Sequence, residues 1–147
     1  MAKQALLLSI RAQFAEKIFS GTKRVELRRR RPKIGPGDLV FVYVPSPAKA
    51  VQGAFEVKEV ISGSPATIWQ RFAEVAGITK IEFDAYFQER ECGCAIVIGR
   101  IWRLSKPVKL EQLRKERQNF HPPQSFHYKC PNDFSRSIGF QLPTRSA

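Results

Sequence analysis

The stretch from residue 35 to residue 47 limits the possible folds more than any other part of the sequence. Its apolar run, Leu39–Val44, is rich in β-branched and aromatic residues. Gly35-Pro36-Gly37-Asp38 precedes this run and Pro45-Ser46-Pro47 follows it. Because the run between these chain breaks is too short for a buried helix, it predicts a buried strand. A second strand, Ala50–Ile61, is expected directly afterwards.

The remaining apolar segments predict further short strands and helices. Strands are expected at Ala5–Ile10, Arg24–Arg29, Cys92–Leu104 and Ser137–Leu142. Helices are expected at Ala12–Ser20, Ser64–Gly77, Lys80–Gln88 and Leu110–Arg117, with a loop over His121–Phe134. These helices are too few for a doubly wound parallel sheet. We therefore expect an α+β fold, a small mixed or antiparallel β-barrel of five to six strands with short helices around it.

The length of 147 residues predicts one domain over residues 1–147, with a loop-rich extension at 118–147 that packs on the barrel. No apolar run approaches the ~20 residues that a membrane-spanning helix needs. The apolar stretch near the N-terminus is too short for a signal peptide, so a cytoplasmic protein is expected. In that reducing compartment Cys92, Cys94 and Cys130 are expected to be free thiols.

The charge of the chain is strongly positive, with 25 Lys and Arg against 13 Asp and Glu. Residues 1–37 and 103–147 carry this excess, whereas residues 38–102 are close to neutral. A basic surface favours a polyanionic partner, because its side chains release counterions from phosphate backbones. We expect the two basic ends to meet on one face of the molecule.

The segment Gly21–Arg28 reads Gly-Thr-Lys-Arg-Val-Glu-Leu-Arg and follows the pattern G-x-K-x-x-E-x-R. This pattern resembles the signature of the ASCH domains, the activating signal cointegrator homology family of the PUA-like superfamily. The expected strand and helix over Leu6–Ser20 precede it, and Tyr43–Gly53 loosely resembles a second family segment, Y-x-S-x-P-x-x-x-x-x-G. The resemblance covers residues 5–115. It implies a PUA-like barrel whose cleft binds RNA or a nucleobase-like ligand.

One branch of this family hydrolyses N4-acetylcytidine, and the resemblance places its catalytic lysine at Lys23. Glu26 stands where that branch has a threonine. Ala76 stands where it has a glutamate, with Glu74 two residues away. An amidohydrolase acting on acylated cytidine, or a ribonuclease, is therefore the alternative to a binding module without turnover.

Lys23, Glu26 and Arg28 are the candidate residues of the cleft. Glu26 and Arg28 share a strand face, and Lys23 lies at the preceding turn. A partly desolvated lysine beside a carboxylate can act as a nucleophile or base, which makes Lys23 and Glu26 the catalytic candidates of an enzyme. Alternatively, Glu26 accepts hydrogen bonds from a base and Arg28 binds phosphate. An ordinary surface salt-bridge cluster would have the same spacing.

Further RNA-binding candidates are basic, aromatic or polar. An arginine run predicts phosphate contacts, and aromatic rings in loops predict base stacking. These candidates are Arg29, Arg30, Arg31, Tyr43, Ser46, Gln124, Phe126 and Tyr128.

No metal site and no cofactor is expected. Cys92 and Cys94 lack the C-x-x-C spacing of zinc sites, and His121 and His127 lie six positions apart. The sequence thus favours an RNA-binding module with a nucleobase-sized cleft. Its partner would be RNA, another nucleic acid or a modified nucleoside, and not a membrane. A transcription co-regulator that docks to protein or DNA is a third reading.

Overall fold

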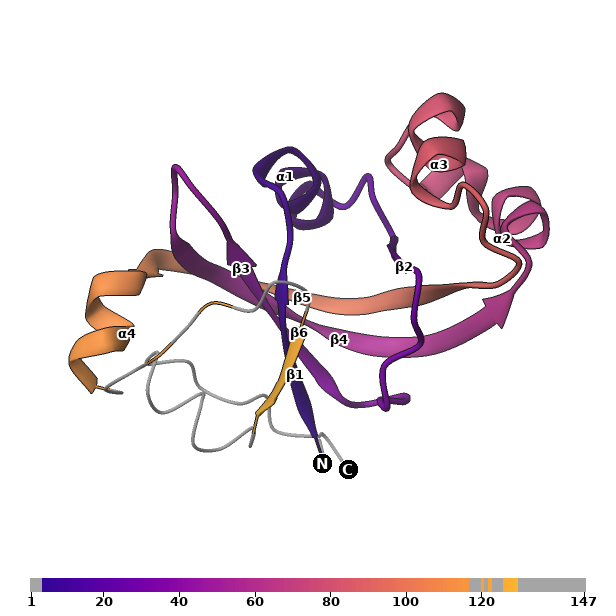
Figure 1. The fold of residues 1–147 in the computed structure, drawn as a ribbon. Coiled ribbons are helices and arrows are strands. Elements are labelled where there is room, and N and C mark those ends of the chain that lie inside the picture. Colours follow the sequence, from indigo (N-terminus) through magenta and orange to yellow (C-terminus); the bar gives the residue numbers. More distant parts are fainter. Residues whose placement is uncertain (1–3, 117–119, 121, 123–125, 130–147) are drawn as a thin grey trace.

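The computed structural model describes residues 4–116, 120 and 122, together with the backbone of residues 126–129. Its strands are β1 (Ala5–Ser9), β2 (Val25–Arg28), β3 (Leu39–Val44), β4 (Ala50–Gly63), β5 (Gly93–Lys109) and β6 (Phe126–Lys129). Its helices are α1 (Ala12–Ser20), α2 (Pro65–Phe72), the 3-10 turn η1 (Ala73–Val75), α3 (Lys80–Tyr86) and α4 (Leu110–Glu116) (Figure 1).

The described strands form one mixed sheet in the order β2-β5-β4-β3-β1-β6. Only β1 and β3 pair in parallel, and the other neighbours are antiparallel. The long strands β4 and β5 run from α4 at one end to α2 and α3 at the other (Figure 1). The sheet curls into a half-barrel with short helices around it, so the expected α+β, PUA-like architecture is confirmed.

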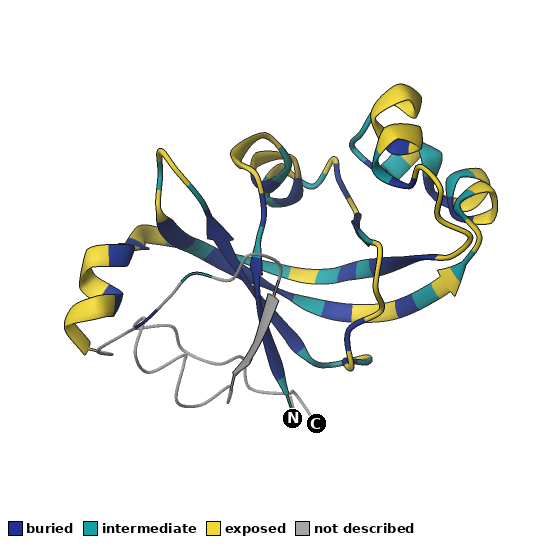
Figure 2. Cartoon of the chain, in the orientation of Figure 1, coloured by how far each residue is buried: buried dark blue, intermediate teal, exposed yellow. Residues whose placement is uncertain are grey.

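Strands β1 and β3 are buried on both faces of the sheet, which explains their nearly uninterrupted apolar sequences. Along β1, Leu6 and Leu8 point into a core cluster shared with α1, while Ala5 and Leu7 point into the cluster beneath α4. Every residue of β3 is buried (Figure 2). A third cluster packs α2 and α3 onto β2 and the adjacent part of β5. One face of β2 therefore packs against the apolar cluster of α2 and α3, and the other face does not.

The helix ends follow the local signals in the sequence. Gly21 ends α1 in the left-handed conformation, with a φ of 87°, which glycine adopts without steric cost. The Ser64 side chain accepts a hydrogen bond from the Thr67 amide, and Pro65 is the first residue of α2. Thr79 and Glu82 form a reciprocal capping box at the start of α3.

Two features differ from the sequence-based expectations. Residues 126–129 were expected in a loop but form β6, which pairs with β1 at the edge of the sheet. Strand β6 brings part of the second basic end to the first, but the arginine run after β2 does not meet the basic helix α4. The basic run after β2 lies near one end of β5, whereas α4 follows the other end (Figure 1). The expected strand at Ser137–Leu142 lies outside the described residues.

No helix among the described residues is long and apolar enough to cross a membrane.

Candidate functional site

A cavity of about 470 Å³ opens where the end of β1, the start of α1, strand β2 and helix α3 come together. Its volume lies in the range of small-molecule sites, which is large enough for one nucleotide. Charged and aromatic groups dominate its wall. They include Lys23, Glu26, Arg28, Arg29 and Tyr86.

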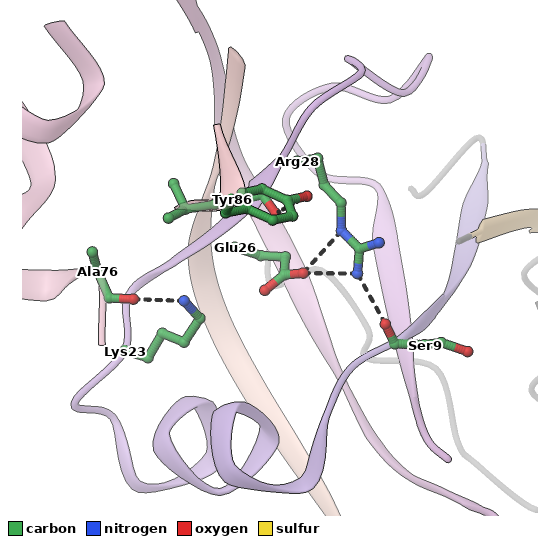
Figure 3. Close-up of polar contacts among 7 residues, drawn as sticks. Ser9, Lys23, Glu26, Arg28, Ala76 and Tyr86 are labelled. Carbon is green, nitrogen blue, oxygen red and sulfur yellow. Dashed lines mark hydrogen bonds and ion pairs between the residues drawn. The ribbon is translucent and has the colours of Figure 1, made fainter. Parts of the chain in front are cut away.

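Strand β2 supplies the central pair of charges. Its alternate residues Val25 and Leu27 pack into the cluster under α2 and α3, so Glu26 and Arg28 face the cavity. Arg28 Nε donates to Glu26 Oε2 at 2.9 Å, and Nη2 forms an ion pair with the same oxygen at 2.8 Å (Figure 3). Arg28 Nη2 also donates to the Ser9 carbonyl at 3.0 Å, which joins β2 to the end of β1.

Lys23 lies at the turn before β2 and is only 3% exposed. Its Nζ donates to the Ala76 carbonyl at 2.5 Å and lies 5.2 Å from the centre of the Phe14 ring. Burial lowers the pKa of the Lys23 ammonium, the Glu26 carboxylate opposes this shift, and nearby cations add to it. Lys23 is therefore a buried amine that gives up its proton more easily than an ordinary lysine.

The segment from Val75 to Ile78, of which Ile78 lines the cavity, is tied closely to the Lys23 turn. The Arg24 amide donates to the Val75 carbonyl at 2.8 Å, and Lys17 Nζ donates to the Gly77 carbonyl at 3.0 Å. Gly77 has a φ of 65°, and a Cβ there would lie 2.8 Å from Lys23 Cβ. Glycine at position 77 therefore allows this segment to approach the aliphatic part of the Lys23 side chain.

At the other side of the cavity, β2 is joined to the end of α3. Tyr86 Oη donates to the Leu27 carbonyl at 3.2 Å. Arg29 Nε donates to the Tyr86 carbonyl at 2.8 Å, and the guanidinium carbon lies 4.5 Å from the centre of the Tyr86 ring. Burial raises the pKa of the Tyr86 phenol, so this group stays neutral and donates its hydrogen bond at ordinary pH.

The polar groups of the cavity keep binding capacity for a ligand. Between described residues, the Glu26 carboxylate uses only Oε2 in hydrogen bonds, although its side chain is 9% exposed. Lys23 uses one of its ammonium hydrogens, on Ala76, among the same residues. A buried acceptor and a buried donor thus face one cavity. This arrangement can hold a base edge, a ribose hydroxyl or a phosphate.

The structure brings together Lys23, Glu26, Arg28 and Arg29 from the sequence-predicted set. Arg30 and Arg31 are exposed just beyond them, and Arg31 Nη1 donates to Ser62 Oγ at 3.0 Å.

The other predicted residues do not line this cavity. Tyr43 is 2% exposed and packs on the opposite face of β3, in the cluster beneath α4. The sequence placed it correctly in a strand, but the alternation of side chains turns it away from the cavity. Ser46 is exposed in the turn between β3 and β4. Gln124 lies outside the described residues, and of Phe126 and Tyr128 only the backbone in β6 is described.

Several cavity residues were not predicted from the sequence. Ser9, Phe14 and Tyr86 line the cavity, yet the sequence predicts for them only a place within a strand or a helix. Glu82 lies at the cavity as well, with its carboxylate bonded to the Thr79 amide and hydroxyl. The capping pattern was the only local signal for Glu82.

The cysteines show no metal-binding arrangement in the described part of the chain. No three His, Cys, Asp or Glu side chains there are grouped closely enough to hold an ion. Cys92 is an exposed free thiol and Cys94 a buried one. Burial raises the pKa of the Cys94 thiol to about 11, which makes it an inert core group at neutral pH. Cys130 lies outside the described residues.

The curled mixed sheet, with a polar cavity beside the short edge strand β2, matches the PUA-like class of fold. The particular family is the ASCH domain family, to which residues 8–119 match and to which this chain therefore belongs.

Three comparisons illustrate this similarity, two with Zymomonas mobilis and one with Staphylothermus marinus. The ASCH domain-containing ribonuclease of Zymomonas mobilis is 32% identical over 123 residues, which are 84% of this chain and 82% of that protein. The crystal structure of ASCH from Zymomonas mobilis has a TM-score of 0.85 at 28% identity and covers 91% of this chain and 93% of its own. The N-terminal domain of McrB from Staphylothermus marinus shares the fold alone, with a TM-score of 0.57 at 14% identity over 95% of this chain and 94% of its own.

Proposed function

We propose that this chain binds single-stranded RNA with one nucleotide in the cavity, and that it cleaves the RNA backbone there. Membership of the ASCH family supports an RNA-related function. The similar protein from Zymomonas mobilis is named a ribonuclease. The observation that carries the proposal is the buried Lys23, whose lowered pKa and cavity position place an amine beside the Glu26–Arg28 pair.

This group has the chemistry that RNA cleavage by the ribose 2′-hydroxyl requires. Glu26 accepts the 2′-hydroxyl proton as the 2′-oxygen attacks the phosphorus atom, and the bond from phosphorus to the 5′-oxygen breaks. The Lys23 ammonium donates a proton to the departing 5′-oxygen, for which its lowered pKa suits it. Arg28 balances the charge that develops on the phosphate. The products are a 2′,3′-cyclic phosphate and a 5′-hydroxyl end.

The decisive experiment compares cleavage and binding in Lys23→Met and Lys58→Met. Lys58 is an exposed lysine of β4 and serves as the matched control. Removal of a general acid typically lowers the rate by about 10²- to 10⁴-fold, so Lys23→Met should lose cleavage of a labelled single strand by at least that lower factor. Its binding of a 2′-deoxy analogue should change far less. Lys58→Met should cleave like the original protein.

Three outcomes would contradict different parts of the proposal. If Lys23→Met cleaves as fast as Lys58→Met, Lys23 is not the acid. If the unaltered protein neither binds nor cleaves single-stranded RNA at low salt, the RNA function itself is wrong. Binding that does not weaken with salt would count against phosphate contacts, because these release counterions.

Glu26→Gln distinguishes recognition of a nucleobase from simple electrostatic binding of phosphate. A cavity that reads a base through Glu26 should lose about 1–3 kcal/mol of preference at one nucleotide and keep its salt dependence. A site that binds only phosphate should bind every RNA equally well or better, because a negative charge has been removed. If the variant binds all RNAs more tightly without a change in nucleotide preference, the cavity does not read a nucleobase. RNA binding would then be due to the basic surface alone.

Hydrolysis of N4-acetylcytidine is the second candidate, because Lys23 lies in a cavity of nucleoside size. Two contacts argue against it. Glu26, at the position of the threonine, is paired with Arg28. Ala76, at the position of the glutamate, offers Lys23 only its backbone carbonyl. Incubation with N4-acetylcytidine, followed by chromatography for cytidine, tests this activity directly.

A further inference from the structure

Arg29 is an exposed arginine with an unusually fixed position at the rim of the cavity. Its Nε donates to the Tyr86 carbonyl at 2.8 Å, and its guanidinium carbon lies 4.5 Å from the centre of the Tyr86 ring. Tyr86 is itself anchored, because its Oη donates to the Leu27 carbonyl. The guanidinium plane is therefore oriented before any ligand arrives, and ordering it on binding costs little entropy.

Arg29 differs from the other arginines that lie over aromatic rings in the described chain. Those others also pair with a carboxylate, which neutralises them. They are Arg71 over Phe72 with Glu59, Arg100 over Trp102 with Glu56, and Arg103 over Phe19 with Glu16. Arg29 forms no ion pair with any described residue, and it alone of these four lines the cavity. Its charge and its outer face are thus available at the place where a ligand would leave the cavity.

We propose that the guanidinium of Arg29 is the stacking platform for a second nucleotide, adjacent in the strand to the one in the cavity. This inference rests on the proposed function, since it assumes RNA in the cavity. A guanidinium plane stacks on unpaired bases as aromatic rings do, and the Tyr86 ring supports it from below. The substrate is then a single strand of at least two nucleotides, because a free nucleoside cannot reach both subsites. A base paired within a duplex cannot lie flat on Arg29.

The contacts favour a base over a phosphate as the partner of Arg29. Phosphate binds a guanidinium at its edge, through the forked N–H groups. The Nε corner of that edge is already used on the Tyr86 carbonyl, whereas the outer face is open and Arg29 is exposed. Arg30 and Arg31, which follow Arg29 in the sequence, are exposed and do not line the cavity. They are the candidates for contacts to the phosphates that follow.

The test uses non-cleavable 2′-O-methyl oligonucleotides of uniform sequence, measured by calorimetry at fixed salt. The set holds the mononucleotide, the trinucleotide, and trinucleotides that lack the base at the first or the third position. One stacked base contributes about 1–3 kcal/mol. The intact trinucleotide should therefore bind at least about fivefold more tightly than one of the two abasic forms. Whether affinity is lost on removal of the first or of the third base shows in which 5′-to-3′ direction the RNA runs across Arg29.

Variants of the protein test whether Arg29 causes the difference in affinity between the intact and the abasic trinucleotides. Arg29→Lys keeps the charge but loses the plane, so it should abolish the difference between intact and abasic strands and keep the salt dependence. Arg100→Lys is the matched control, a stacked arginine outside the cavity, and it should preserve the difference. Tyr86 acts as a positioning residue. Tyr86→Leu should reduce the difference, and Tyr86→Phe should restore most of it.

Four results would overturn this inference, and the last would also contradict the proposed function. Equal binding of the intact and both abasic trinucleotides would exclude a second base subsite. An intact-to-abasic difference that survives Arg29→Lys would place that subsite elsewhere. A loss of affinity in Arg29→Ala that is equal for all three strands would make Arg29 a phosphate contact. If the unaltered protein binds no trinucleotide at all, the proposed function fails together with this inference.

Discussion

Two ion pairs in this molecule have the same chemistry and opposite surroundings. Arg28 and Glu26 form a pair beside the cavity, with side chains 12% and 9% exposed. Arg100 and Glu56 form a pair on the outside of β5 and β4, with side chains 54% and 24% exposed. An exposed pair contributes about 0–1 kcal/mol, whereas burial of two charges removes several kcal/mol of hydration. The buried pair is thus poorly explained by stability alone, which supports a role in ligand binding.

The largest expected effect comes from removing one charge of the buried pair. Glu26→Gln removes the carboxylate that pairs with Arg28, and breaking a buried ion pair in this way destabilises proteins by about 3–5 kcal/mol. We expect a value near the lower end, about 3 kcal/mol, because the amide oxygen still accepts a hydrogen bond. Chemical denaturation with a fixed m-value measures this change.

Glu56→Gln is the matched control, and it should change the free energy of unfolding by less than about 1 kcal/mol. Equal effects of the two substitutions would show that water enters the cavity freely and screens Arg28. The low exposure of the Glu26–Arg28 pair would then not support a role in ligand binding.

Most of the fold could be predicted because it follows from local patterns. Strand β3 begins and ends where the sequence predicts, since Leu39–Val44 lies between chain-breaking segments. Helix α1 ends at Gly21 and α2 begins at Pro65, as their capping residues indicate. Strand β6 could not be predicted, because residues 126–129 form a strand through pairing with residues 5–8 at the other end of the chain.

In the candidate site, too, the features set by local sequence could be predicted and those set by long-range contacts could not. Lys23, Glu26 and Arg28 were predicted because their spacing on a short strand is local and resembles a family motif. The carbonyl that holds Lys23 belongs to Ala76, 53 positions away, and the one that holds Arg29 belongs to Tyr86, 57 positions away. No local pattern encodes such contacts, since they depend on how α3 packs against β2.

A second prediction tests how closely the chain around Gly77 packs against Lys23. Gly77→Ala places a Cβ 2.8 Å from Lys23 Cβ at a φ of 65°. The left-handed conformation alone costs about 1–2 kcal/mol for alanine, so we expect a loss of about 2 kcal/mol or more. Gly21→Ala is the control, because its φ is 87° and no atom lies within 4 Å of the new Cβ. If both variants lose the same stability, the chain around Gly77 moves away from Lys23 without an energetic cost. The Lys23 side chain would then not be held in place by this contact.

A third prediction concerns the pH dependence of stability. Burial lowers the pKa of Lys23 below 10.5, so between the two pKa values the unfolded chain binds a proton that the folded chain has released. The contribution of Lys23 to the free energy of unfolding should therefore rise as the pH increases through this window toward 10.5. Lys23→Met lacks this contribution, so the difference in stability between the unaltered protein and the variant should grow with pH.

The loss of the hydrogen bond to Ala76 adds about 1 kcal/mol that does not depend on pH, so only the slope is diagnostic. Lys58→Met should show no such slope, because Lys58 is exposed. A slope that is the same in both variants would mean that Lys23 keeps its proton as an ordinary surface lysine does.

The smallest effect should come from the exposed arginine that Arg29 most resembles. Arg100 lies 5.3 Å from the centre of the Trp102 ring and pairs with Glu56, yet its side chain is 54% exposed. Solvent screens such a pair, and Arg100→Gln should change the free energy of unfolding by less than about 1 kcal/mol. RNA affinity should fall only slightly, through a weaker long-range attraction that disappears at high salt. Affinity for a trinucleotide, measured at low and high salt beside Arg29→Gln, checks this expectation. A larger loss for Arg100→Gln than for Arg29→Gln would shift the RNA path away from the cavity rim and onto the outer face of β5.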